Sequence, residues 1–400
     1  MFAAFLIIGW LFSFQDAGIG PVREIATPAS NHSGEPNLTI GRSGVFLSWI
    51  ERNQDSTQSV RYALLRGGRF LPAHTIHTAP DLFVNWADFP MVIELESGTL
   101  VAHWLQRNGS GSYAYGVQVS TSRDGTRWSR PVVLHEDTAE TEHGFVSLFR
   151  TAPDQAGAVW LDGRKYAARG PGKASGNVGA EMTVRYRTIN NDGDLGPEKE
   201  IDARACDCCQ TSVAVTTKGP VVAFRDRSDE EVRDIAVSRL IDGKWSAPRR
   251  VHEDNWIIKA CPVNGPSIDA RGERTVVAWF TGARDTARVN IAFSDDAAES
   301  FGAPVRVDDG APGGRVDVQF LDDGSAVVTW LERVGQASEI RLRRVWPSGR
   351  RSASVTIAKS AGDRPSGFPQ MVRNGNYLVF AWTDTNRLTR VRVATAEIRR

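Results

Sequence analysis

Seven apolar segments that each end in a tryptophan or a phenylalanine recur along the 400-residue chain. Their end residues are about 50–64 positions apart, a period typical of propeller blades. A linker precedes each segment, and a polar loop with one or two further short strands follows it. Four short strands per unit predict an all-β, seven-bladed propeller with four-stranded antiparallel blades. The seven end residues are Trp49, Trp104, Trp160, Phe224, Trp279, Trp330 and Trp382.

The two ends of the chain indicate how such a ring would close. The last unit, residues 368–398, has three strands, and residues 22–25 form a spare strand near the start. Pairing this spare strand with the last unit would complete the seventh blade and remove its open edges. A six-bladed ring and a tandem of β-sandwiches are the alternatives to this architecture.

Residues 2–14 are almost uninterrupted apolar sequence. A run of this length is too short to span a bilayer comfortably and suits a secretory signal, so we expect a signal peptide at 1–17 and one propeller domain at 18–400. The protein would then be secreted or periplasmic. An uncleaved N-terminal membrane anchor is the alternative.

Composition narrows the classes of partner. The chain is 41% hydrophobic and 24% charged with a net charge of +1, as expected for a soluble globular protein. Basic and acidic residues are interspersed, which argues against nucleic-acid or membrane-surface binding. The GxSxG, HExxH and phosphate-loop motifs are absent, and no cofactor is expected.

Three turn sequences carry a family resemblance. Residues 122–129 (SRDGTRWS) and 294–301 (SDDAAESF) resemble the Asp-box, or BNR, turns of sialidase-like propellers, and residues 242–248 (DGKWSAP) resemble a shorter form. The resemblance implies that these turns join the third and fourth strands on the face opposite the active site. It also implies sialidase-like chemistry, in which three arginines hold a carboxylate and a tyrosine activated by a glutamate acts with an aspartate. Sialidases have six blades, so a count of seven departs from that pattern.

In a propeller, the linkers that enter the blades and the loops after the second strands share one rim. An arginine follows each blade aromatic, and its planar fork suits a carboxylate, sulfate or phosphate. A solvated rim of arginines paired with neighbouring acids is the alternative. The predicted ligand-binding residues on this rim are Arg164, Arg225, Arg227, Arg284, Arg333, Trp86, Trp256, His143 and Asn264.

Catalysis would need acids that converge on the same rim. The candidates are Asp226, Glu142, Asp162 and Asp207, although the sequence identifies no tyrosine and glutamate as a pair. The glycine-rich loop at 161–181 is either a lid over a pocket or an insertion.

All four cysteines lie in the linkers before the fourth and fifth blades, so we expect them to meet at the rim. An even number in an oxidising compartment favours two disulfides, Cys206 with Cys261 and a vicinal Cys208–Cys209 bridge. A Zn or Cu(I) site and free thiols are the alternatives.

The expected function follows from the rim and the resemblance. We expect a secreted, monomeric, sialidase-like propeller that binds an acidic carbohydrate or another anionic ligand and, as an enzyme, would hydrolyse it as an exo-glycosidase. The alternatives are a non-catalytic glycan- or protein-binding propeller and a soft-metal or redox site at the cysteines.

Overall fold

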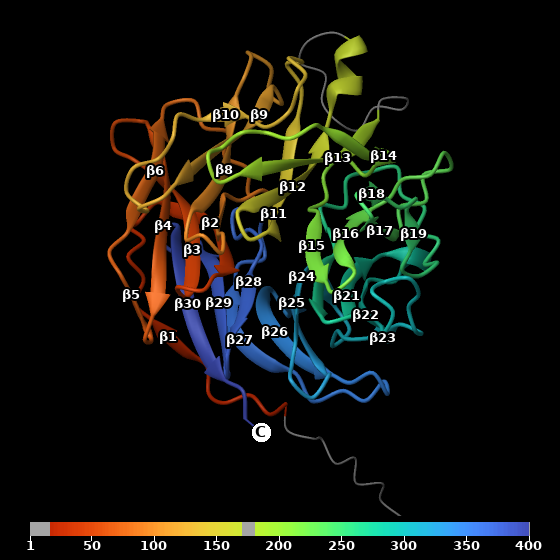
Figure 1. The fold of residues 1–400 in the computed structure, drawn as a ribbon. Coiled ribbons are helices and arrows are strands. Elements are labelled where there is room, and N and C mark those ends of the chain that lie inside the picture. The colour runs from red at the N-terminus through yellow and green to blue at the C-terminus, as the bar shows by residue number, and fades with distance from the viewer. Residues whose placement is uncertain (1–16, 170–180, 400) are drawn as a thin grey trace, which may run out of the picture.

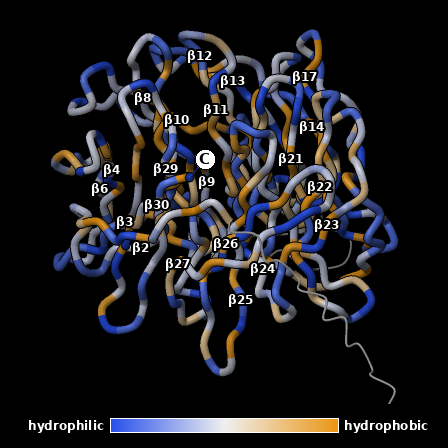
Figure 2. Tube along the Cα trace, turned by 90° about the horizontal axis from the view of Figure 1, so that it is seen from below, coloured by the Kyte–Doolittle hydropathy of each residue, from blue (hydrophilic) through white to orange (hydrophobic). Residues whose placement is uncertain are grey.

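Seven antiparallel sheets follow one another around a ring in the computed structural model, which describes residues 17–169 and 181–399 (Figures 1 and 2). The innermost strands of successive sheets contact each other, and the last contacts the first, so the ring is closed. The predicted seven-bladed propeller is therefore confirmed, and the six-bladed and tandem-sandwich alternatives are wrong. The predicted signal peptide at 1–17 lies outside the described residues except for Ala17.

The first three blades contain the following strands, from the channel outward. Blade 1 consists of β2 (Ser33–Ile40), β3 (Val45–Arg52), β4 (Gln58–Arg66), β5 (Arg69–Phe70) and β6 (His74–Ala79). Blade 2 consists of β7 (Met91–Glu94), β8 (Leu100–Arg107), β9 (Tyr115–Ser122) and β10 (Val132–Val133). Blade 3 consists of β11 (His143–Ala152), β12 (Gln155–Asp162), β13 (Met182–Asn190) and β14 (Lys199–Ala205). A short 3-10 helix, η1 (Arg164–Arg169), follows β12.

The next three blades continue the ring. Blade 4 consists of β15 (Ser212–Thr216), β16 (Gly219–Arg225), β17 (Ile235–Ile241), β18 (Lys244–Trp245) and β19 (Arg249–Arg250). Blade 5 consists of β20 (Ser267–Arg271), β21 (Arg274–Thr281), β22 (Arg288–Ser294) and β23 (Val305–Arg306), with a 3-10 turn η2 (Ala283–Asp285) after β21. Blade 6 consists of β24 (Pro312–Phe320), β25 (Ala326–Val334), β26 (Ala337–Val345) and β27 (Val355–Ser360).

Blade 7 closes the ring with strands from both ends of the chain. It combines β28 (Gln370–Asn374), β29 (Tyr377–Asp384) and β30 (Arg390–Glu397) with the N-terminal β1 (Arg23–Ile25). Arg23 pairs with Thr395 and Ile25 with Val393 in an antiparallel ladder. The expected closure by the spare strand is confirmed. No helix among the described residues is long and apolar enough to cross a membrane.

The core is divided among the interfaces between blades. Seven apolar clusters each combine residues of two neighbouring blades, so most blades bury both faces. This explains why the second strands are continuous apolar runs rather than alternating sequences. The seven blade aromatics lie in these clusters, each facing the preceding blade.

Three of the buried blade tryptophans share one polar contact. The indole Nε1 of Trp49 donates to Glu51 at 2.9 Å, and that of Trp330 donates to Glu332 at 2.6 Å. Trp160 likewise donates to Asp162 at 2.9 Å. A carboxylate two residues after the tryptophan therefore satisfies a buried donor that would otherwise destabilise the core.

Two turns that resemble Asp boxes lie where they were expected. Residues 122–128 join β9 to β10 and residues 294–301 join β22 to β23, both on the face opposite the blade-entry linkers. In the first turn, the Asp124 carboxylate accepts the backbone N–H groups of Thr126 and Arg127, each at 2.8 Å. The positions agree with the expectation, and the assignment to the Asp-box family stays a prediction.

Candidate functional site

The linkers and loops predicted to form one rim do lie on one face, which we call the upper face. Ser33, at the start of β2, pairs with Glu51 near the end of β3, and His143, at the start of β11, pairs with Asp162 at the end of β12. The innermost strands therefore begin where the second strands end. We call the opposite side, where β30 ends, the lower face; it lies at the bottom of Figure 1.

The upper end of the central channel is covered by aromatic rings and a guanidinium group. The Arg315 guanidinium lies 4.8 Å from the Trp86 ring and 5.6 Å from the Phe368 ring, and it donates to the Gly367 carbonyl at 2.6 Å. Burial lowers the pKa of Arg315 to about 10. Trp86, a predicted ligand-binding residue, thus packs against Phe368 at the upper face.

Arg225, a predicted anion ligand, is a buried structural residue. Its guanidinium donates to the backbone carbonyls of Asn264 (2.8 and 3.1 Å), Arg233 (2.6 Å) and Phe280 (2.8 Å). It also lies 4.9 Å from the ring of Trp256, another predicted ligand-binding residue. Arg225 therefore links blade 4 to blade 5, because its guanidinium N–H groups donate to backbone carbonyls.

Asn264 is part of the same junction between blades. Its carbonyl accepts from Arg225, and its side-chain Oδ1 accepts the Arg315 backbone N–H at 2.7 Å. Its own side-chain amide donates to the Pro262 carbonyl at 3.1 Å. Asn264 is buried and thus connects the end of β16 and the start of β24 to the linker before blade 5.

Arg227 and Asp207 belong to a buried ion network between blades 3 and 4. Arg227 donates to Asp207 at 3.2 Å and to Glu231 at 2.7 Å, and Arg233 donates to Glu231 at 2.8 Å. Burial raises the pKa of Asp207, and the neighbouring Cys206 raises it further. Burial and the charge of Asp207 raise the pKa of the nearby Tyr166.

Glu142, a candidate acid, forms a pair that sequence reasoning did not find. The Tyr115 hydroxyl donates to Glu142 Oε1 at 2.6 Å, and both side chains are buried. Tyr115 begins the third strand of blade 2 and Glu142 precedes blade 3. Aligning the loops of neighbouring blades would have brought the two together, since both flank the same upper-face junction.

Asp88 lies beside this tyrosine–glutamate pair. Its carboxylate accepts the Phe145 backbone N–H, and it contributes to raising the pKa of Tyr115. Burial raises the pKa of Asp88 itself to about 7, although backbone hydrogen bonds from Phe145, Phe89 and Val146 oppose this shift.

The pH dependence of stability provides a test of buried Asp88. Its pKa is higher in the folded chain than in the unfolded chain, so the folded state keeps the proton between about pH 4 and pH 7. The stability that the neutral carboxyl contributes is present below pH 4 and is lost as the pH rises to 7. We expect the free energy of unfolding of the native chain to fall relative to Asp88→Asn across this range, by up to about 1.4 kcal/mol per pH unit. Denaturant titrations from pH 4 to 8 measure the difference, and parallel curves for the two proteins would contradict it.

His143 and Arg164 lie in a second charged network at blade 3. His143 Nε2 lies 3.0 Å from Asp137 Oδ2, and the His143 ring stacks on the His135 ring at 3.8 Å. Arg164 contacts Asp162 at 2.7 Å, Asp137 at 3.2 Å and Glu198 at 2.7 Å. Three carboxylates of the protein thus form ion pairs with the Arg164 guanidinium, which was predicted to bind an anionic ligand.

Asp162 has a repeated structural role that its sequence position reveals. It accepts from Trp160 in the same way that Glu51 and Glu332 accept from the tryptophans two residues before them. Although burial raises the pKa of Asp162, the hydrogen bonds from Arg164 and Trp160 and the charges of His143 and Arg164 together lower it. A carboxylate at this repeated offset satisfies an indole, so its presence alone does not indicate catalysis.

The remaining candidates lie nearer to solvent. Asp226 is partly exposed and accepts the Arg227 backbone N–H at 2.7 Å, while burial raises its pKa. Arg284 and Arg333 are exposed, and neither forms an ion pair with another described residue. The structure therefore separates the predicted arginines into three that are bonded internally and two that face solvent.

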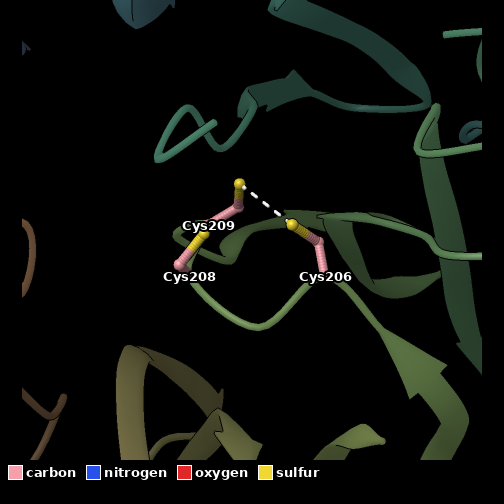
Figure 3. Close-up of side chains that lie close together, drawn as sticks. All are labelled: Cys206, Cys208 and Cys209. Carbon is pink, nitrogen blue, oxygen red and sulfur yellow. Dashed lines mark hydrogen bonds between the residues drawn. The ribbon is translucent and has the colours of Figure 1, made fainter. Parts of the chain in front are cut away.

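The four cysteines meet at the upper face as expected. Cys206, Cys208 and Cys209 lie on the linker between β14 and β15, with Sγ atoms within 4.8 Å of one another (Figure 3). Cys261 comes from the next linker and lies near enough to Cys208 to contribute to the raised pKa of that thiol. All four are free thiols here, and Cys206 Sγ is 3.5 Å from Cys209 Sγ. The predicted bridges Cys206–Cys261 and Cys208–Cys209 stay predictions.

Together, these features define a seven-bladed propeller whose upper face combines buried ion networks, a cysteine cluster and exposed arginines. No family model and no curated protein sequence matches the chain. Solved structures do share the fold at low sequence identity, which shows the fold alone.

Three of these structures illustrate the likeness. A protein of unknown function from Dyadobacter fermentans DSM 18053 is 16% identical with a TM-score of 0.52, over 80% of this chain and 97% of that one. The Penicillium chrysogenum α-L-arabinanase complexed with arabinobiose is 12% identical with a TM-score of 0.51, over 94% and 98%. The subtype N10 neuraminidase-like protein of A/little yellow-shouldered bat/Guatemala/060/2010 is 7% identical with a TM-score of 0.51, over 95% and 98%.

Proposed function

We propose that this chain is a monomeric, secreted or periplasmic propeller that binds an acidic glycan across its upper face. The observation that carries the proposal is a set of exposed upper-face arginines that form no ion pair with other described residues. They come from strand ends, turns, loops and linkers of blades 2, 5, 6 and 7, and they are Arg107, Arg284, Arg333, Arg364 and Arg387.

The distribution of these arginines favours an extended anionic ligand. Guanidinium groups on several blades can each contact a separate carboxylate or sulfate of a polymer. A single small carboxylate would instead need arginines that converge, and Arg164, Arg225 and Arg227 are bonded to the protein itself. The likeness of the fold to an arabinanase complexed with a sugar is consistent with a carbohydrate ligand.

The geometry favours binding without turnover. Glu142, Asp162 and Asp207 are buried and contact neighbouring side chains. A glycoside hydrolase needs an acid and a second carboxylate that reach opposite sides of the scissile bond. The alternative of a non-catalytic glycan-binding propeller is therefore the one that these residues support.

Binding to charged polysaccharides tests the proposal. We expect affinity for at least one of heparin, polygalacturonate and polysialic acid, little affinity for neutral arabinan, and weakening as salt increases. The variant R284A/R333A is expected to bind at least about tenfold more weakly, because each charged hydrogen bond contributes about 1.5–3 kcal/mol. Isothermal titration calorimetry at low and high salt provides the affinities.

A lower-face variant is the matched control. Arg66 and Arg69 are also exposed and form no ion pair within the described part of the chain, so R66A/R69A makes the same change in charge. Equal weakening by the two variants would contradict an upper-face site. Release of sugar from any of these polymers that E142Q abolishes would replace binding with catalysis as the function.

A further inference from the structure

The linker between blades 3 and 4 concentrates sulfur atoms at a single point. The chain folds back between β14 and β15, so that the sulfurs of Cys206 and Cys209 face each other (Figure 3). Their Sγ atoms are 3.5 Å apart, and all three Sγ atoms of the linker lie within 4.8 Å of one another. The three side chains are at most 8% exposed and pack in the apolar cluster between blades 3 and 4.

A fourth sulfur opens this cluster toward solvent. Cys261 is exposed, and it lies near enough to buried Cys208 to contribute to the raised pKa of that thiol. It comes from the linker before blade 5, so the linkers that enter two neighbouring blades bring their cysteines close together. An ion entering from the upper face would meet Cys261 before the buried thiols.

The spacing of the sulfurs fits a shared ion. A metal–sulfur distance of about 2.3 Å places thiolates roughly 3.8–4.0 Å apart around one ion. The observed spacing, from 3.5 Å to less than 4.8 Å, brackets this value. A disulfide requires sulfurs about 2.05 Å apart, so oxidation would need the pair to move together.

Hydrogen-bond donors point at two of the sulfurs. Arg233 Nη1 donates to Cys206 Sγ at 3.3 Å, and the Asn264 backbone N–H donates to Cys209 Sγ at 3.4 Å. Glu231 fixes the Arg233 guanidinium at 2.8 Å. Donors and a positive charge directed at sulfur stabilise the thiolate form that binds metals, as outer contacts do in metal sites generally.

We propose that Cys206, Cys208 and Cys209 bind one thiophilic d10 metal ion, Cu(I) or Zn(II), and that Cys261 is the solvent-facing fourth sulfur. Soft thiolate ligands favour these ions over Mg²⁺ or Ca²⁺. Three thiolates suit trigonal Cu(I), and four suit tetrahedral Zn(II). The site is independent of the proposed glycan surface, because it uses none of the exposed arginines.

Metal titration of the reduced full-length chain tests the site. The chain is stripped with a chelator, reduced under argon and given Cu(I) or Zn(II) alone in competition with a chromogenic chelator. We expect one equivalent per chain of at least one ion, with protection of the three buried thiols from alkylation. Loss of a residue that hydrogen-bonds a metal ligand typically lowers metal affinity roughly 10–100-fold, and we expect a decrease of this size for R233Q. Loss of a ligand itself, in C206S or C209S, is expected to lower the affinity by more.

Two further variants distinguish the two metal ions and the two groups of clustered ligands. C261S should weaken a tetrahedral Zn(II) site strongly but leave a trigonal Cu(I) site intact, so the two ions are distinguished. H135Q alters the other group of clustered ligands, His135, Asp137 and His143. This variant should bind the same number of metal ions per chain, with the same affinity, as the native chain. Thermal melting of each variant shows whether a loss of metal reflects unfolding. Alkylation of the native chain with and without metal shows protection of the thiols without any substitution.

Three outcomes would overturn the proposal. The first is that neither ion is retained against a chelator of micromolar affinity. The second is equal retention by the native chain and by C206S/C209S. The third is a disulfide that involves Cys206, Cys208 or Cys209 in protein alkylated directly in the producing cells, whether Cys206–Cys209 or one of the predicted bridges Cys206–Cys261 and Cys208–Cys209.

Discussion

Replacing Arg225 with methionine is expected to lower the free energy of unfolding by about 3–5 kcal/mol. The side chain is 2% exposed and donates to the carbonyls of Asn264, Arg233 and Phe280. Methionine keeps much of the apolar stem but leaves buried acceptors unsatisfied, at about 1–3 kcal/mol each. Urea unfolding followed by tryptophan fluorescence measures the change.

The control for Arg225→Met is Arg333→Met at an exposed position near the end of β25. Arg333 forms no ion pair among the described residues, so we expect its replacement to change stability by no more than about 0.5 kcal/mol. A small effect of Arg225→Met, together with loss of glycan affinity, would show that Arg225 serves a ligand and not the junction between blades 4 and 5.

The blade architecture could be predicted because each unit repeats the same physical requirement. A second strand that is buried on both faces must be apolar throughout, and its final aromatic packs against the preceding blade. Trp49 and Trp330 show this requirement almost identically, five blades apart along the chain. The closing strand followed from the same logic, since the last unit had one strand too few.

The roles of the rim arginines could not be predicted from their neighbours in sequence. Arg225 and Arg333 both follow a blade aromatic closely, and each has an acid beside it. Arg225 ends a buried strand and points to the carbonyls of blade 5, whereas Arg333 extends to solvent. The direction of each arginine side chain depends on its packing against the neighbouring blade. The residues next to the arginine in sequence do not predict that packing.

The cysteine cluster was partly predictable. Adjacent linkers meet at the upper face, so the approach of Cys261 to Cys208 followed from topology. The short contact between Cys206 and Cys209 depends on the turn within the linker, where the Cys206 backbone N–H donates to the Arg225 carbonyl at 2.9 Å. Spacing in the sequence does not determine that turn.

Asp162→Ala is expected to lower the free energy of unfolding by about 3–5 kcal/mol, because it removes one partner from a buried charged network. The carboxylate is fully buried, accepts from Trp160 and pairs with Arg164. Gln106→Ala is the matched control: Gln106 accepts from Trp104 at the same offset, at 3.4 Å, but carries no charge. We expect a loss of only about 1 kcal/mol there.

Asp162→Asn separates the structural role of this residue from a catalytic one. The amide oxygen can still accept from Trp160, while the charge that pairs with Arg164 is lost, so we expect a stability between those of the native chain and Asp162→Ala. Thermal and denaturant unfolding of the variants establish the order. If both variants unfolded like the native chain and lost turnover on a glycan, Asp162 would be a catalytic acid. A graded loss of stability instead places it with Glu51 and Glu332, as a carboxylate that accepts from the tryptophan of its own blade.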